Sequence, residues 1–144
     1  MAAVRKVIPL MLILAVIIQE GLLSSPLAQL FQVKYCNSQI AISQTANTTV
    51  VVGIAGQKIY ICSILLISAT AQSLSLVEGT GTACGTGKVA IIGGTNASIS
   101  VIDQGGFSAI SPFGWLSMAS GNNLCLLQSG TGNISGVITY KQMY

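Results

Sequence analysis

The chain has 144 residues, of which 51 % are hydrophobic and only 6 % are charged, with a formal net charge of +3. Disordered segments combine low hydrophobicity with high charge, so this composition excludes an ordinary disordered chain and indicates one folded domain. Acid–base catalysis is disfavoured, because the chain has no histidine and its three acids, Glu20, Glu78 and Asp103, are far apart in sequence. The lysines beyond residue 28 are spread singly, which disfavours a nucleic-acid partner.

The first 28 residues have the organisation of a secretory signal. A basic start that includes Arg5 and Lys6 precedes an apolar run at residues 7–18, and a stretch of small residues then ends at Ala28. A membrane-spanning helix needs about 20 apolar residues, so the run is too short for one. We therefore predict a cleaved leader over residues 1–28 and a single β domain over residues 29–144. An uncleaved anchor and a helix that packs against its own copies are the alternatives.

Four cysteines, Cys36, Cys62, Cys84 and Cys125, all follow the leader. An even number of cysteines after an export signal indicates two disulfides formed in an oxidising compartment. Zinc is disfavoured, because four-cysteine zinc sites use close pairs such as C-x2-C, whereas these cysteines are 26, 22 and 41 residues apart. Three disulfide pairings are open, and we favour Cys36 with Cys62 and Cys84 with Cys125.

From residue 39 onward, the hydrophobic pattern is that of short β-strands separated by turn residues. The predicted strands, in chain order, cover residues 39–43, 48–55, 58–68, 72–78, 89–92, 98–103, 115–118, 123–128 and 134–141. A glycine-rich loop at residues 79–87 separates the fourth strand from the fifth. Eight or nine strands at near-regular spacing are typical of an antiparallel sandwich or barrel.

The strand predicted over residues 58–68 is apolar on both faces. Strict alternation places four apolar residues on one of these faces, namely Ile59, Ile61, Leu65 and Ile67. A strand in a sheet with one solvated face alternates polar and apolar residues, so two apolar faces mean that both faces are covered. We predict that a second subunit covers the face formed by these four residues, which makes the protein a homo-oligomer. A covering loop of the same chain is the alternative.

Residues 105–115 form the best candidate for an exposed apolar loop. They contain three aromatic residues, Phe107, Phe113 and Trp115, which could stack on a ligand such as carbohydrate. Aromatic residues placed singly in strands also occur as core or interface residues, and that role is the alternative for these three.

Motifs for phosphate and metal binding are incomplete. A P-loop would need glycine where Thr82 stands, and serine or threonine where Val89 follows Lys88. A calcium loop needs several acids at close spacing, whereas Glu78 and Asp103 each stand alone. We therefore expect no catalytic residue, no metal site and no cofactor.

Five segments carry the more specific motifs of the chain. They are GQKIYI at residues 56–61, CSILLISATAQSLSLVE at residues 62–78, GTGTACGTG at residues 79–87, NNLCLLQS at residues 122–129 and SGVITY at residues 135–140. With these motifs, residues 36–140 resemble a family of small proteins encoded in tailed-phage and prophage genomes. The resemblance implies a jelly-roll-like antiparallel β-sandwich of about eight strands, a virion-surface or tail-associated location and assembly as a trimer. It implies no catalytic residues.

These observations predict a non-enzymatic structural module that is exported or lies on a virion surface. Its expected partners are its own copies, with a trimer favoured, and other virion or cell-surface proteins. A signal-like leader is unusual for a virion protein assembled in the cytoplasm, so a secreted bacterial surface protein that binds carbohydrate or cell envelope is the first alternative. A small secreted enzyme is the second alternative. Such an enzyme would need Glu78, Lys88 and Asp103 close together in the fold.

Overall fold

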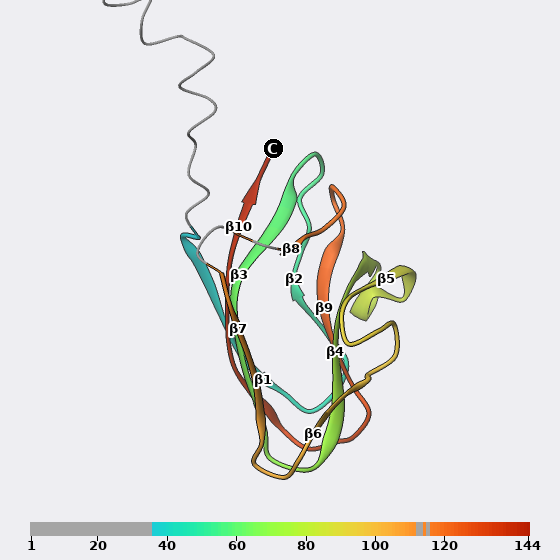
Figure 1. The fold of residues 1–144 in the computed structure, drawn as a ribbon. Coiled ribbons are helices and arrows are strands. Elements are labelled where there is room, and N and C mark those ends of the chain that lie inside the picture. Colours follow the sequence, from blue (N-terminus) through green and yellow to red (C-terminus); the bar gives the residue numbers. More distant parts are fainter. Residues whose placement is uncertain (1–35, 112–113, 115) are drawn as a thin grey trace, which may run out of the picture. The chain divides into compact units, whose positions relative to one another are not determined.

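A computed structural model describes residues 36–111, 114 and 116–144 (Figure 1). The predicted leader, its boundary with the domain, and the aromatic residues Phe113 and Trp115 lie outside these residues. The strands all belong to one unit of the chain, Lys34–Tyr144.

The described residues form ten strands, which make two antiparallel sheets. The elements are β1 (Ser38–Gln44), β2 (Thr48–Val51), β3 (Lys58–Ser68), β4 (Gln72–Thr80), the 3-10 turn η2 (Thr82–Cys84), β5 (Thr86–Ile92), β6 (Ile99–Val101), β7 (Gly106–Ile110), β8 (Leu116–Ser117), β9 (Asn123–Gln128) and β10 (Ile134–Met143). The first sheet has the order β1-β10-β3-β7, and β8 also pairs with β3. The second sheet has the order β2-β9-β4-β5, and β6 also pairs with β4. Figure 1 shows the two sheets facing each other.

The chain crosses between the sheets in the manner of a jelly roll. Strands β1, β3 and β10 lie in the first sheet, whereas β2, β4 and β9 lie in the second. Strands β5 and β6 pair with different parts of β4 and share one strand position, and β7 and β8 share another position beside β3. The ten strands therefore fill eight positions, four in each sheet. The predicted all-β, jelly-roll-like sandwich of about eight strands is confirmed.

The core lies between the two sheets and is built from alternate residues of the central strands. Leu74 and Leu76 of β4 both point into it, as the alternation in residues 72–78 predicts. The largest buried core side chains are Ile59, Ile61, Ile64, Leu66, Met118, Leu124, Leu126, Ile134 and Ile138. Burial of one such side chain stabilises the fold by about 1.5–3 kcal/mol, so this layer is the main source of stability.

One extra residue in β3 changes which side chains face the core. In the pairing with β10, Ile61 lies opposite Tyr140 and Ser63 lies opposite Thr139. Cys62, between Ile61 and Ser63, therefore has no partner and forms a β-bulge. Because side chains alternate with a period of two, one inserted residue reverses which positions point inward.

The bulge divides the face that strict alternation predicts. Ile59 and Ile61, before the bulge, point into the core and are 1 % and 0 % exposed. Leu65 and Ile67, after the bulge, point outward and are 46 % and 44 % exposed. The prediction that these four residues share one face is wrong, because alternation does not continue through the inserted residue.

Both favoured disulfides are present. Cys36, just before β1, is bonded to Cys62 in β3, and Cys84 in η2 is bonded to Cys125 in β9. Closing loops of 26 and 41 residues stabilises the fold by roughly 3–4 kcal/mol each in the chain-entropy model. Two disulfides are compatible with an extracellular protein. Over the described part of the chain, no helix has the length and hydrophobicity to cross a membrane.

Candidate functional site

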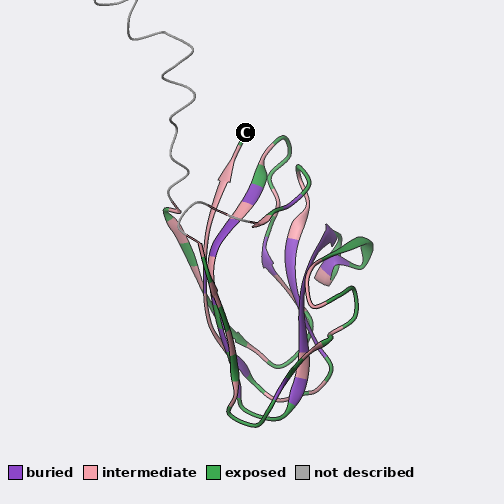
Figure 2. Cartoon of the chain, viewed as in Figure 1, coloured by how far each residue is buried: buried purple, intermediate pink, exposed green. Residues whose placement is uncertain are grey.

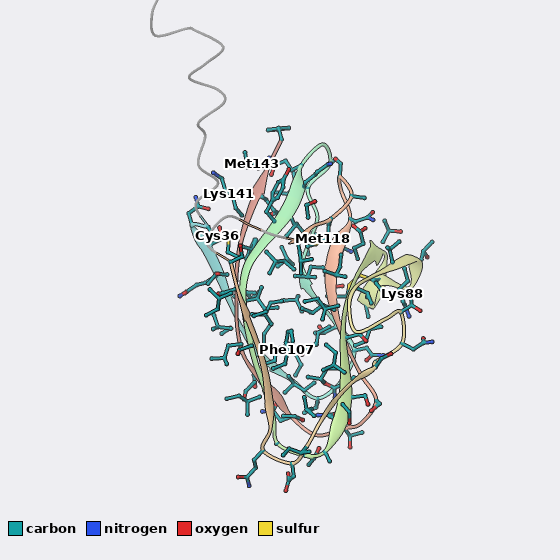
Figure 3. The ribbon with its side chains drawn as sticks, viewed as in Figure 1. Cys36, Lys88, Phe107, Met118, Lys141 and Met143 are labelled. Carbon is teal, nitrogen blue, oxygen red and sulfur yellow. A yellow bond between two sulfur atoms is a disulfide. The ribbon has the colours of Figure 1, made fainter. Side chains whose placement is uncertain are left out.

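Glu78, Lys88 and Asp103, the charged residues of the predicted enzyme alternative, do not all lie together. Glu78 lies near the C-terminal end of β4, whereas Asp103 follows β6, which pairs with the start of β4. Six residues of extended strand span about 20 Å, so the two acids lie near opposite ends of β4. Lys88, labelled in Figure 3, is exposed on β5 and precedes Val89, the residue that pairs with Glu78, so it lies near Glu78 and not near Asp103.

Glu78 holds a loop in place. Its side chain is 8 % exposed, and its Oε2 atom accepts hydrogen bonds from the Ala119 backbone N–H and, at 3.4 Å, from Asn122 Nδ2. Both donors lie in the loop between β8 and β9, so the carboxylate fixes this loop against β4. This arrangement accounts for a buried acid in a chain with very few charges.

Phe107 is not part of an exposed binding loop. It lies in β7, opposite Leu66 of β3, and its side chain packs against the core between the sheets (Figure 3). The prediction of an exposed loop is wrong here, because residues 106–110 form a strand that turns Phe107 inward and the neighbouring Ser108 and Ile110 outward. Any binding role of Phe113 and Trp115 falls outside the described residues.

The cavity between the sheets has no room for a ligand. It lies next to Phe107 of β7. Its lining is mainly apolar and includes Leu66, Leu76 and Ile99. The volume open to the centre of a water molecule is about 10 Å³. A space of this size holds about one water molecule, and not a sugar ring. Among the described residues, no group of three or more His, Cys, Asp or Glu side chains could hold a metal ion.

Part of the outer face of the first sheet is uncharged and is left exposed by the described residues. Outward-pointing residues of β1, β10, β3 and β7 form three rows across it, which we call the open face. The rows are Ser43, Ser135, Ile67 and Gly106; Ala41, Val137, Leu65 and Ser108; and Gln39, Thr139, Ser63 and Ile110. None of these residues is buried and none is charged. The most exposed large side chain among them is Ile110, at 80 %.

Over β4 and β9, the outer face of the second sheet is covered by the chain itself. Val77 of β4 and Cys125 of β9 belong to a second apolar cluster, apart from the main core, and both are 0 % exposed. Cys84 of η2, bonded to Cys125, lies over them. Ser75 of β4 donates a hydrogen bond at 2.5 Å to the carbonyl of Gly93, which holds the segment after β5 on the same face. Figure 2 shows most of β4 and β9 in the purple of buried residues.

Among the described residues, the chain therefore covers the outer face of β4 and β9 and leaves the three rows of the first sheet exposed. The open face carries methyl, methylene and hydroxyl groups, with a few amides, and none of these groups titrates near neutral pH. Such a surface can pack against another protein surface without burying an unpaired charge. Packing against another surface is the chemistry that these groups support.

The structure brings together some of the predicted site residues and separates others. It pairs the four cysteines as favoured, and it leaves Leu65 and Ile67 on the open face while Ile59 and Ile61 enter the core. Ile110 and Val137 also lie on the open face and were not predicted to do so. The alternation covers only Phe107, Ser108 and Ala109 and breaks at Ile110, so the sequence gives no clear signal that Ile110 points outward.

No protein-family model matches the chain, and neither a curated protein nor a solved structure matches it. The fold, the two disulfides and the open face are the observations on which a function can be proposed.

Proposed function

We propose that this chain is a non-enzymatic structural module of a virion or extracellular surface, and that it self-associates. The observation that carries the proposal is the open face, where Leu65, Ile67 and Ile110 are exposed on an uncharged sheet. A sheet that leaves apolar residues and an uncharged edge in water is prone to unspecific association. Specific contact between copies removes that surface from water.

A phage or prophage particle is the setting that we favour, with the protein as a decoration, tail or fibre component. The resemblance of residues 36–140 to proteins encoded in tailed-phage and prophage genomes supports this setting. The jelly roll is also an architecture of viral capsid domains, although the same fold serves lectins. A filled core and two disulfides suit a module that must persist on a particle.

A secreted bacterial surface protein that binds carbohydrate or cell envelope is the second candidate. The two disulfides favour it, because disulfides form in oxidising compartments and a virion assembled in the cytoplasm does not pass through one. Phe107 packs against the core, so it could not stack on a sugar. The single tryptophan of the chain, Trp115, gives a fluorescence signal with which polysaccharide binding can be followed.

Native and intact mass spectrometry of the non-reduced protein, purified from an exporting host, tests the proposal. We expect a trimer without the leader, in which each subunit weighs four hydrogens less than the reduced chain because both disulfides are formed. A monomer that keeps residues 1–28 and four free thiols would contradict both export and self-association. A monomer without the leader whose tryptophan fluorescence responds to cell-wall polysaccharide would establish the second candidate.

A further inference from the structure

We propose that one end of the domain docks on the surface of a bilayer that contains anionic lipid. This end, which we call the docking tip, consists of the loop between β2 and β3, residues 52–57, and the end of the chain after Tyr140, residues 141–144. Docking of this kind goes beyond the structural role proposed above and does not require self-association, since Leu65 and Ile110 of the open face are not part of the tip.

The docking tip exposes two aliphatic side chains and one aromatic side chain. Val52 and Ile54 are 69 % and 48 % exposed, and Tyr144 is 88 % exposed. Tyr144 lies beside the loop, because a Cβ atom on Gly56 would be 3.4 Å from the Tyr144 ring. Exposed apolar side chains that gather at one place mark a contact with a protein or a membrane.

Hydrogen bonds within the chain hold this loop in shape. The Gln57 N–H donates to the Ile54 carbonyl and the Gly121 N–H donates to the Gln57 carbonyl, both at 2.9 Å. Gln142 Nε2 donates at 2.8 Å to the Val52 carbonyl, which ties the loop to the end of β10. The apolar side chains can therefore enter an apolar medium without leaving these three carbonyl groups unpaired.

Positive charge gathers at the same end of the domain. Lys58 of β3 lies opposite Met143 of β10, so Lys141 is its diagonal neighbour on one face of the sheet, roughly 7–8 Å away. The exposed acid Asp103 lies at the other end, after β6. Glu78 lies nearer the tip, but it is 8 % exposed and accepts two hydrogen bonds from the chain. This separation of charge draws the docking tip toward an anionic surface.

The chain also enters the domain from this end. Strand β1 begins close to Tyr140 and runs antiparallel to β10, and Figure 3 shows Cys36 near Lys141 and Met143. Residues 29–35, which follow the predicted leader and precede Cys36, have the sequence QLFQVKY. Aromatic and lysine side chains are the ones that suit the boundary between lipid and water. The segment joined to this end therefore suits the same surroundings as the tip.

A bilayer fits the docking tip better than a protein or a nucleic acid does. A stable protein interface buries about 800 Å² on each partner, whereas a bilayer takes up single apolar side chains and attracts each lysine by about fivefold in affinity. A nucleic acid would engage the lysines but leave Val52 and Ile54 in water. A carboxylate on Tyr144, if the chain ends there, would offset one lysine, so the apolar side chains supply most of the binding.

Flotation with lipid vesicles tests the docking tip, with the protein as purified from an exporting host and at a concentration that keeps every variant monomeric. Phosphatidylcholine vesicles are compared with vesicles that also contain phosphatidylglycerol. The tip variant is Val52→Ser with Ile54→Ser. Its matched control is Ile102→Ser with Ile67→Ser, because these residues are 75 % and 44 % exposed and lie toward the other end. Circular dichroism checks that each variant is folded.

We expect the wild type to float with both kinds of vesicle and to bind the anionic kind more tightly. The tip variant should bind both kinds about tenfold more weakly, and the control should stay within about twofold of the wild type. The variant Lys58→Gln with Lys141→Gln should lose about fivefold or more on anionic vesicles and little on neutral ones.

Each other outcome overturns a defined part of the account. A wild type that floats with neither kind of vesicle would overturn docking. Equal losses for the tip variant and its control would overturn the location of the contact, and so would unchanged binding of the tip variant. A lysine variant that keeps its preference for anionic vesicles would overturn the role of the lysines. Native mass spectrometry decides self-association separately. If a double variant does not fold, Val52→Ser and Ile102→Ser replace the two double variants.

Discussion

Ile61 and Ile64 both point into the core of the sandwich, although the odd spacing between them should place them on opposite faces of β3. They share a face because Cys62 is an extra residue in the pairing of β3 with β10. The bulge also places Cys62 where it can bond to Cys36, so one local irregularity sets both the core and a disulfide.

Alanine substitutions at these two positions test the bulge. We expect Ile61→Ala and Ile64→Ala each to lower the free energy of unfolding by about 2–5 kcal/mol, because each leaves a cavity in the core. Urea denaturation measures the free energy of unfolding of both variants, at a protein concentration that keeps every variant monomeric. Leu65→Ala is the control. It should lower the free energy of unfolding less than either isoleucine variant, since Leu65 is 46 % exposed. If one isoleucine proved as tolerant as Leu65, β3 would alternate without a bulge.

Gly136 lies at a close approach of β10 to β3. Its φ is +153°, and a Cβ atom on it would lie 1.9 Å from the backbone carbonyl oxygen of Leu65. We expect Gly136→Ala to lower the free energy of unfolding by about 3 kcal/mol or more, because the backbone of β10 or β3 must move to relieve the clash. The matched change Gly85→Ala, whose Cβ would lie 3.3 Å from its nearest neighbour, should cost far less. Thermal unfolding compares the two variants. Equal melting temperatures would contradict the close approach of β10 to β3 at Gly136.

The two disulfides differ in access to solvent. Cys84 and Cys125 are both 0 % exposed, whereas Cys36 is partly exposed. Reduction requires a thiolate to reach a disulfide sulfur, so we expect a mild reductant to open Cys36–Cys62 first under native conditions. Timed alkylation followed by peptide mass spectrometry gives the order. Earlier labelling of Cys84 and Cys125 would show that η2 does not cover this face as described.

We expect Glu78 to stabilise the fold. Glu78→Ala removes the acceptor of the Ala119 N–H and should cost about 1–3 kcal/mol, because it leaves a partly buried donor without its partner. Glu78→Gln keeps an oxygen at this position and should cost less. Urea denaturation of both variants provides the comparison. If the two variants were equally stable, the hydrogen bond to Ala119 would contribute nothing.

Local features of the fold could be predicted from the sequence. The bounds of β3 and β9 follow from runs of apolar residues, and the inward side of β4 follows from the alternation that includes Leu74 and Leu76. The disulfide pairing was one of three that the sequence leaves open. These features depend on neighbouring residues or on spacing along the chain.

The remaining features depend on contacts between distant segments. The strand order could not be obtained from periodicity, because β1 pairs with β10 at the other end of the domain, and the jelly roll was implied by the resemblance. The bulge at Cys62 has no signal in the residue types around it. Val77 looks like an outward residue of β4, and only the path of residues 81–98 shows that it is covered. The strand at Phe107 was missed because its glycines are typical of a loop.

The central claim is that the open face is covered by another copy in the native protein. Hydroxyl-radical footprinting of the wild-type protein tests it directly, without any substitution. In a single copy, Leu65, Ile110 and Val89 are 46 %, 80 % and 51 % exposed, so all three should be oxidised readily if the protein is a monomer. We predict that Leu65 and Ile110 are oxidised much more slowly than Val89, because only the first two are covered. Oxidation of Leu65 and Ile110 at rates similar to Val89 would contradict the claim.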